Sequence, residues 1–528
     1  MPFDYSALRD RWYHDGWFSD RTCLDAFEAG AREHGSTPVV FATADAVETV
    51  TVGEIHDRAR SLAAALQRLG TRSGDAVAVQ LTNRVECAVA YQAVLLCGAV
   101  LVPIVHIYGV AEVGFILAQS GARVLIMPER FRTVSNTARI PEFSPIATLH
   151  HVVVVDAAQG DGYLTWSQLQ ASEDYRRPQV SADAVCLLLY TSGTTSAPKG
   201  VQHSHNTVLA EQRTLPALIA GAPDDVSLAT FPPGHIAGVG NMLRPLMSGG
   251  RTVFLDGWDP VRAVELGHEY GVTSTAGAPI HLQDILDLGG TGVKLPALRE
   301  FLVGAAPVSE ELGRRAAAAG IATFRSYGAT EHPTVTGEHA GEPQWARLGT
   351  DGKPLPGSSV RILAPDGAQA PTGGDGEVVI QGPEQFVGYR DAALNADAFT
   401  ADGWLRTGDL GHVDAAGRLT ITDRIKDVIV RGGETISSGQ VEEALNSHPA
   451  VAEGAALAAP DPRHGEVVAA VVVLKPGAAL DIDSLLRHFA AAGLAKQKTP
   501  ERLVIVDALP RTALGKVRKA ELRRTHFG

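Results

Sequence analysis

The chain of 528 residues contains few cysteines, few methionines and few aromatic residues. Its four cysteines, Cys23, Cys87, Cys97 and Cys186, form no CxxC pair, so the sequence indicates neither a disulfide framework nor a zinc site. Three of them lie in apolar runs, which is typical of buried, reduced thiols. This cysteine usage predicts a cytoplasmic protein, because thiols stay reduced in that compartment.

The sequence also lacks a long uninterrupted hydrophobic run. Its most apolar stretch, residues 89–105, contains Gln92 and is broken by Gly98 and Pro103. It therefore predicts a buried helix followed by a strand rather than a membrane span. The N-terminal residues are polar and indicate no signal peptide, so we expect no stable insertion into a membrane.

Hydrophobic residues make up 45% of the chain and charged residues 20%, which is typical of a globular protein. The length of the chain suits two or more domains.

Positive charge is in deficit over most of the chain. The net charge of −13 disfavours nucleic acid or anionic lipid as partners. Residues 424–528 carry +3 and the preceding residues −16, which fits either a phosphate-handling C-terminal lid or ordinary surface variation.

Helical and strand patterns alternate through the first two-thirds of the chain. Thr51 to Glu54 forms a capping-box pattern, and apolar residues from Ile55 to Leu69 follow at helical spacing. Short apolar runs bounded by turn residues predict strands at 76–81, 124–127, 152–155, 185–190, 252–255 and 301–303. Strands separated by helices predict mostly parallel α/β layers.

The pattern changes after Gly349. Alternating residues at 360–363, 377–380 and 419–422 predict a small antiparallel β subdomain. A further compact domain follows Arg424, and its first helix is expected to begin near Ser437. That side chain can cap the helix while Gln440 reaches back.

A loop rich in hydroxyl groups follows the predicted strand at 185–190. Residues 190–200 read YTSGTTSAPKG, and such a loop can surround a polyphosphate with N–H and hydroxyl donors, with Lys199 as a point charge. It is not a Walker A loop, because Pro198 precedes the lysine and Gly200 follows it. By itself it is also compatible with a polar surface turn.

The loop resembles the phosphate-binding signature of the adenylate-forming superfamily, which includes acyl-CoA and aryl-CoA synthetases, stand-alone adenylating enzymes and firefly-type luciferases. The resemblance continues in order over nearly the whole chain. Its further motifs are FPPGHIAG (231–238), SYGATEHP (326–333), GEVVIQGPEQFVGYR (376–390), WLRTGD (404–409), DRIKDVIVRGGETI (423–436) and PRTALGKVRK (510–519). The N-terminal and middle parts of the sequence are most similar to those of ligases for cyclohexanecarboxylate and medium-chain acids.

The resemblance implies an α/β fold in two domains. Residues 1–425 would form a large N-terminal domain of layered α/β subdomains with a small β-barrel-like subdomain, which binds acid and ATP. Residues 426–528 would form a small, mobile α+β lid.

The resemblance also implies an ATP site. In it, Tyr327 would stack on adenine, Thr330 would contact the α-phosphate, and Asp409 and Arg424 would bind the ribose, since an ionised carboxylate can accept from both hydroxyls. The implied ATP-binding set is Thr191, Ser192, Gly193, Thr194, Thr195, Lys199, Tyr327, Gly328, Thr330, Asp409 and Arg424. Glu331, together with a loop hydroxyl such as that of Thr191, would ligate Mg²⁺, which favours one or two carboxylates plus phosphate oxygens.

Three further residues have implied catalytic roles. Lys516 would bridge the substrate carboxylate and the α-phosphate, a task suited to a flexible ammonium. Lys426 would be the hinge about which the lid rotates for thioester formation, and His235 would gate the acyl pocket. Gly432 and Gly433 would then let the backbone approach the pantetheine arm of coenzyme A.

The acid pocket has no aspartate in FPPGHIAG to hold an amino group, and Ile236 follows the histidine where hydroxybenzoate-activating relatives carry asparagine. Small residues at pocket positions leave room for a bulky apolar acid; they are Gly238, Gly240, Gly304, Ala305 and Ala306, with His235 at the entrance. Two departures from the family pattern are Ser196, where glycine is usual, and Ser438 with Gly439, in a segment that often contains proline.

The motifs together predict an acyl-CoA ligase that uses ATP, Mg²⁺ and coenzyme A. One alternative is an enzyme that loads the acyl group onto a carrier protein. Another, suggested by Ser196, is a ligase with weakened adenylation that mainly thioesterifies a supplied acyl-adenylate. Luciferase-like oxidation has no specific support, and a non-catalytic relic would not be expected to retain Lys199, Glu331, Asp409 and Lys516.

Overall fold

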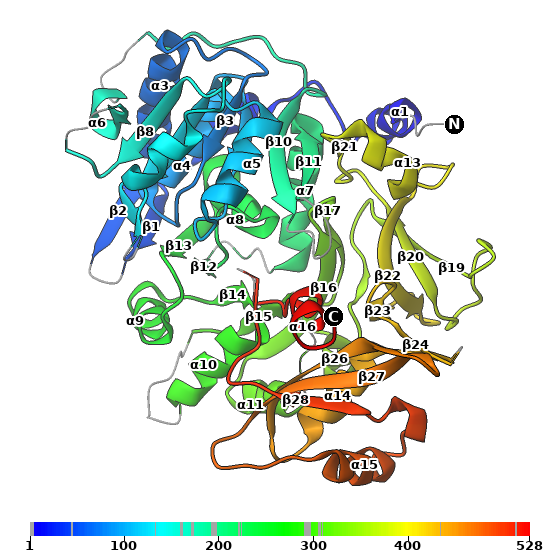
Figure 1. Ribbon diagram of the computed structural model, residues 1–528. Coiled ribbons are helices and arrows are strands. Elements are labelled where there is room, and N and C mark those ends of the chain that lie inside the picture. The colour runs from blue at the N-terminus through cyan, green and yellow to red at the C-terminus, as the bar shows by residue number, and fades with distance from the viewer. Residues whose placement is uncertain are drawn as a thin grey trace. The chain divides into compact units, whose positions relative to one another are not determined.

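The computed structural model describes most of the chain, in two compact units (Figure 1). The described residues are 5–43, 46–131, 134–158, 162–169, 174–191, 198–219, 222, 224–289, 297–304, 308, 310–432, 434–512 and 515–528. The first unit comprises the described parts of 1–191, 198–359 and 381–405, and the second those of 360–380 and 406–528.

An eight-stranded sheet of the first unit contains the two strands between which the predicted phosphate loop lies in the sequence. Its strands, in spatial order, are β21 (Gly388–Tyr389), β11 (Lys199–Ser204), β10 (Val185–Thr191), β4 (Val100–Pro103), β3 (Ala76–Val79), β5 (Val124–Pro128), β8 (His151–Val155) and β9 (Leu164–Thr165). Strands β10 to β9 are parallel, whereas β11 and β21 are added antiparallel.

A nine-stranded sheet forms the rest of the first unit's β structure. Its order is β18 (Lys353–Pro354), β17 (His332–Gly337), β16 (Ala322–Ala329), β15 (Glu300–Val303), β14 (Ser274–Gly277), β12 (Val226–Ala229), β13 (Arg251–Leu255), β1 (Pro38–Ala42) and β2 (Val47–Thr51). The strands from β16 to β1 are parallel, and the outer ones antiparallel. The predicted α/β layers and all six predicted strands are confirmed, β3 being two residues shorter than expected.

One hydrophobic core joins residues of both sheets through a layer of helices. These are α2 (Cys23–His34), α3 (Val52–Arg68), α4 (Val85–Leu96) and α8 (Ile236–Ser248). Helix α4 is apolar on all sides and almost wholly buried, as expected of a helix enclosed by other elements. It leads into β4, so the predicted buried helix and strand are confirmed. The Thr51–Glu54 capping box is also present at the start of α3.

The first unit has further helices, and two of them, α6 (Trp166–Leu169) and α7 (His205–Leu218), also contribute residues to this core. The others are α1 (Ser6–His14), α5 (Val110–Ser120), α9 (Pro260–Tyr270), α10 (Pro279–Gly289), α11 (Glu310–Ala318), α12 (Gln344–Gly349) and α13 (Asn395–Ala398). Among the described helices, none is long and apolar enough to cross a membrane.

The second unit contains two sheets. The first has the order β19 (Ser359–Leu363), β20 (Gly376–Gln381), β22 (Leu405–Val413) and β23 (Leu419–Arg424), with β22 and β23 antiparallel. The second consists of β25 (Glu434–Ile436), β24 (Ile429–Arg431), β27 (Gly465–Leu474) and β26 (Val451–Asp461), with β28 (Arg502–Ile505) alongside β27. Its helices are α14 (Ser438–Ser447), α15 (Ile482–Ala491) and α16 (Lys519–His526), coloured orange to red in Figure 1.

Helix α14 begins where the sequence predicted, because the Ser437 side chain accepts a hydrogen bond from the Gln440 N–H. The Gln440 side chain differs from the prediction: its Oε1 accepts from Lys498 Nζ at 2.6 Å. The amide therefore ties the helix start to a later segment of the same unit.

Glu384 is a carboxyl group fully buried in the first unit. Its oxygens accept hydrogen bonds from the hydroxyls of Thr214 and Thr334 and from the Thr334 N–H at 2.9 Å. Burial outweighs these bonds and raises the pKa of Glu384 to about 7. A buried carboxyl with a raised pKa makes the stability of the unit depend on pH.

We expect the contribution of Glu384 to the free energy of unfolding to fall as pH rises from about 4.5 to about 7, because in this window the folded protein holds a proton on Glu384 that the unfolded chain has released. The Glu384 contribution is at most about 3 kcal/mol. Urea unfolding across this range should show that the free energy of unfolding of the parent protein falls relative to that of Glu384→Gln as pH rises. Glu142→Gln, at an exposed site, is the control, and an unchanged slope in Glu384→Gln would contradict the assignment.

Candidate functional site

The β10–β11 hairpin places two of the predicted phosphate-binding residues opposite each other. Thr191 ends β10, Lys199 begins β11, and the two are register partners. Strand β21 extends this hairpin through Tyr389, which pairs with Val201, and the Arg390 N–H donates to the Gly200 carbonyl at 2.7 Å. The predicted loop residues Ser192, Gly193, Thr194 and Thr195, with Ser196, lie outside the described residues.

A second hairpin carries the predicted adenine and metal residues. Tyr327 and Gly328 lie near the end of β16, and Thr330 and Glu331 form the turn that leads into β17. A Cβ atom on Gly328 would lie 1.8 Å from the carbonyl oxygen of Pro333, so only glycine permits the two strands to approach so closely. Gly328 thus has a structural role in addition to the predicted contact with ATP.

The turn at Thr330 and Glu331 is held by backbone contacts on both sides. His203 of β11 lies with its Nε2 2.8 Å from the Thr330 carbonyl oxygen, and the Phe386 N–H donates to the Glu331 carbonyl at 2.8 Å. Desolvation lowers the pKa of the fully buried His203 to about 4, so its ring is neutral at physiological pH and donates from Nε2. These contacts fix the turn relative to the β10–β11 hairpin.

Tyr389 connects the predicted phosphate lysine with the predicted metal ligand. Its hydroxyl donates to Glu331 Oε1 at 2.7 Å, and the Lys199 ammonium lies 5.2 Å from the centre of its ring. Burial first, and the Glu331 charge second, raise the pKa of Tyr389, so the phenol remains a hydrogen-bond donor. The Tyr389 hydroxyl orients the half-buried Glu331 side chain, which fits a Mg²⁺ ligand that also needs phosphate oxygens.

In the second unit, Asp409 and Arg424 are adjacent. They are register partners on β22 and β23, and Arg424 Nε lies 3.1 Å from Asp409 Oδ1. The Thr407 hydroxyl accepts from the Asp409 N–H at 3.0 Å and donates to the Val378 carbonyl at 2.7 Å, which fixes the start of this segment. The arrangement suits the two residues for a shared contact with ribose hydroxyls.

Lys516 lies on a tight turn of the second unit. The Thr512 N–H donates to the Lys516 carbonyl at 2.7 Å, and the Thr512 hydroxyl accepts from the Lys516 N–H at 3.2 Å. Desolvation first, then the charges of Arg424 and Lys426, lower the pKa of the Lys516 ammonium, whereas Asp409 opposes them. The cations Arg424 and Lys426 therefore act on Lys516 together, and such a group of like charges favours the binding of anions.

Lys426 is exposed in the turn between β23 and β24, where the Asp427 and Val428 N–H groups donate to the Arg424 carbonyl. Gly432, at φ +56°, follows β24, and its N–H donates to the His464 carbonyl at 2.8 Å. The predicted CoA residue Gly433 lies outside the described residues.

The predicted acid-pocket residues fall into two groups. His235 is the N-cap of α8, and Gly238 lies in its first turn, where a Cβ atom would lie 2.0 Å from the Pro232 carbonyl oxygen. Gly238 is therefore required by packing, whatever the size of the acid. Among the described residues, no atom lies within 4 Å of a Cβ atom built on Gly304, as would be expected of a pocket residue. Ala305 and Ala306 lie outside the described residues.

Sequence reasoning gave no role to Tyr389 or His203. Tyr389 was within reach, because it is the next-to-last residue of a recognised motif that ends at Arg390. His203 carries no comparable signal, since a histidine inside a buried strand is usually structural. Both depend on the pairing of β11 with segments far along the chain.

Comparison with known proteins identifies the family. The AMP-binding enzyme profile matches residues 27–390, and the profile of the AMP-binding enzyme C-terminal domain matches residues 440–516. In structure, the chain is similar to ATP-bound MatB from Rhodopseudomonas palustris, with a TM-score of 0.84, 28% identity and coverage of 96% of this chain and 99% of that one.

Curated relatives cover nearly the whole chain. A medium-chain fatty-acid–CoA ligase of Escherichia coli (strain K12) is 32% identical over 98% of this chain and 92% of its own. A feruloyl-CoA synthase of Amycolatopsis sp is 33% identical over 95% and 96%. A fatty acid–[acyl-carrier-protein] ligase, ScoC, of Streptomyces coeruleorubidus is 31% identical over 96% and 97%. The chain belongs to the AMP-binding enzyme family, the adenylate-forming enzymes, and within it to the AMP-forming acid–thiol ligases, which use ATP, Mg²⁺ and coenzyme A.

Proposed function

We propose that this protein is an acyl-CoA ligase that converts a bulky apolar carboxylic acid, ATP and coenzyme A into acyl-CoA, AMP and pyrophosphate. The observation that carries this proposal is the cationic group of Lys516, Arg424 and Lys426 beside Asp409. A reaction that joins a carboxylate to a phosphate needs such a group, because it must overcome repulsion between two anions.

The reaction has two steps. A carboxylate oxygen of the acid attacks the α-phosphorus of ATP, and pyrophosphate leaves. The thiolate of coenzyme A then attacks the acyl carbonyl, and AMP leaves. Lys516 would neutralise the two anions in the first step, and Lys199 and Glu331 would hold the polyphosphate end, Glu331 through Mg²⁺.

We place the hinge between the two steps at Lys426, between a domain of residues 1–425 and a lid of residues 426–528. The exposed turn around Lys426 supports this position. Gly432 and Gly433 would contact the pantetheine arm in the second step.

The proposed acid is alicyclic, aryl or medium-chain. The space that the described residues leave beside Gly304 supports a bulky acyl group, and relatives named for medium-chain and feruloyl substrates point to the same range. An acyl-carrier-protein ligase among the relatives favours a second candidate, in which the thiol belongs to a carrier protein.

The proposal is tested by incubating the protein with ATP, Mg²⁺, coenzyme A and a panel of alicyclic, aryl and fatty acids, and by measuring products by mass spectrometry. We expect a new acyl-CoA mass. Acyl-adenylate without acyl-CoA would favour a carrier protein as acceptor, and thioester only from supplied acyl-adenylate would favour weakened adenylation. Absence of product from both acid and acyl-adenylate would contradict the proposal.

Lys516→Ala should lower the rate of acyl-adenylate formation by about 10²–10³-fold, because a charge that stabilises the first transition state is lost. Thioester formation from supplied acyl-adenylate should be nearly unchanged. Pyrophosphate exchange measures the first step and acyl-CoA release the second. Lys496→Ala removes an exposed lysine of the same unit as a control. Equal losses in both steps would refute the division of roles.

Tyr389→Phe should raise the Mg²⁺ concentration that gives half-maximal adenylation by about tenfold or more, because it removes a hydrogen bond to a charged carboxylate. Titration of the exchange rate with Mg²⁺ at fixed ATP measures this effect. Tyr175→Phe is the matched control, since its hydroxyl donates to the Leu96 carbonyl at 3.0 Å. The same change in both variants would show that Tyr389 does not act through Glu331.

A further inference from the structure

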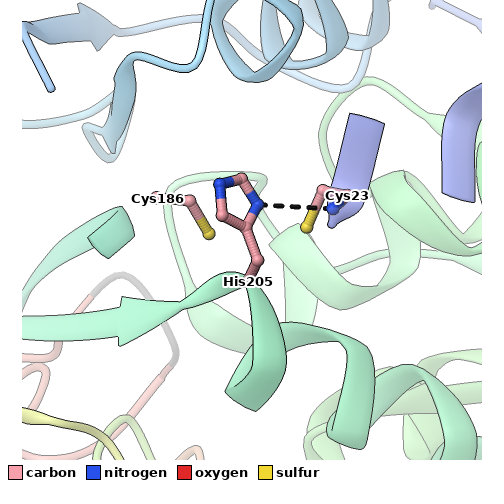
Figure 2. A group of neighbouring side chains, drawn as sticks. All are labelled: Cys23, Cys186 and His205. Carbon is pink, nitrogen blue, oxygen red and sulfur yellow. Dashed lines mark hydrogen bonds between the residues drawn. The ribbon is translucent and has the colours of Figure 1, made fainter. Parts of the chain in front are cut away.

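Two cysteines and a histidine far apart in the sequence meet inside the first unit. Figure 2 shows Cys23, Cys186 and His205 with their side chains directed towards one another. A thiol sulfur or ring nitrogen from each lies within 4.8 Å of the others, and all three residues are at most 1% exposed. Among the described residues, this is the only such group of three or more His, Cys, Asp or Glu side chains.

Each member of this cluster stands at a defined structural position. Cys23 is the first residue of α2, and His205 is the first residue of α7. Cys186 lies in β10, where the register with β11 shifts between Val185 and Leu187. A bulge of this kind redirects a side chain.

The bulge decides which core Cys186 enters. Along a regular strand, Cys186 would share a face with Leu188 and Tyr190, which belong to one core cluster. Instead, Cys186 lies in the same core cluster as Leu187, Leu189 and Cys23. The irregularity of β10 therefore brings the second thiol to the first.

His205 already contacts the first residue of α2. Its Nδ1 accepts from the Cys23 N–H at 3.3 Å, so an ion bound by this nitrogen would replace that hydrogen bond. Cys97 is buried as well but lies outside the cluster.

We propose that Cys23, Cys186 and His205 form a binding site for a soft divalent metal ion of the Zn²⁺ type. Zinc binds thiolate sulfur at about 2.3 Å and imidazole nitrogen at about 2.0 Å, so the three groups can reach one ion with small side-chain movements. Binding releases the protons of both thiols to solvent, and the two thiolates then balance the divalent charge, with the imidazole as the third ligand. Charge balance matters because an uncompensated buried ion is costly.

The site lies at the base of the hairpin whose other end carries the predicted phosphate loop. Val185 and Ser204 pair at this base, next to Cys186 and His205, and Thr191 pairs with Lys199 at the far end. A bound ion would join β10, α7 and α2, and would stabilise the hairpin without contacting ATP.

The experiment is to load the full-length protein, purified under reducing conditions, with Zn²⁺ and to remove weakly bound metal by dialysis. Bound metal is then measured by elemental mass spectrometry, and the melting temperature with and without Zn²⁺. We expect close to one ion per chain and a higher melting temperature after loading. Co²⁺ substituted for Zn²⁺ should give a sulfur-to-cobalt charge-transfer band in the near ultraviolet.

Cys186→Ser and Cys23→Ser should each lose most of the bound metal and the charge-transfer band, whereas Cys97→Ser should keep both. Circular dichroism and acid-dependent pyrophosphate exchange report whether each variant folds, so loss of metal in a folded variant supports the site. Retention of metal by both ligand variants would overturn the proposal. So would a wild-type protein that binds no Zn²⁺, or one that binds only Cu⁺ or forms a Cys23–Cys186 disulfide instead.

Discussion

In the proposed site, Lys199 and Glu331 of the first unit would carry opposite charges, and both would have to stay available to a polyphosphate and its metal ion. Tyr389 meets this constraint, because its ring face contacts the lysine and its hydroxyl binds the carboxylate. Tyr389 is itself uncharged, so it neutralises neither Lys199 nor Glu331. His203 and Phe386 hold the turn that contains Glu331 through hydrogen bonds to its backbone carbonyl groups, and they also help to keep the Glu331 side chain in place. Much of the β11 and β21 pairing can be understood as support for this geometry.

The second unit gathers positive charge, since Arg424 and Lys426 both act on Lys516. Asp409 balances part of it through Arg424, while desolvation and Lys426 leave the Lys516 ammonium less stable than a free one. Such a site gains free energy when anions enter, and it gains most when two anions approach each other. A short turn held by Thr512 provides this placement.

The core of the first unit contains ionisable groups that apolar residues could have replaced. Three hydrogen bonds hold the Glu384 carboxyl group in place, and burial raises its pKa. The group of Cys23, Cys186 and His205 lies in the core that joins the two sheets. Both sites lie next to elements that carry the proposed active-site residues. The buried polar groups therefore contribute to the placement of those elements as well as to the stability of the unit.

Local sequence determined the elements and the family. The capping box at Thr51, the apolar run through α4 and the ordered motifs depend on neighbours only a few residues apart, and short-range periodicity encodes them directly. Which distant residues meet was decided by the tertiary structure. Tyr389 reaches Glu331, 58 positions away, and Cys23 reaches His205, 182 positions away, because sheet order brings those segments together. The bulge that turns Cys186 towards them interrupts the alternation on which a strand prediction relies, so no local pattern could have revealed that cluster.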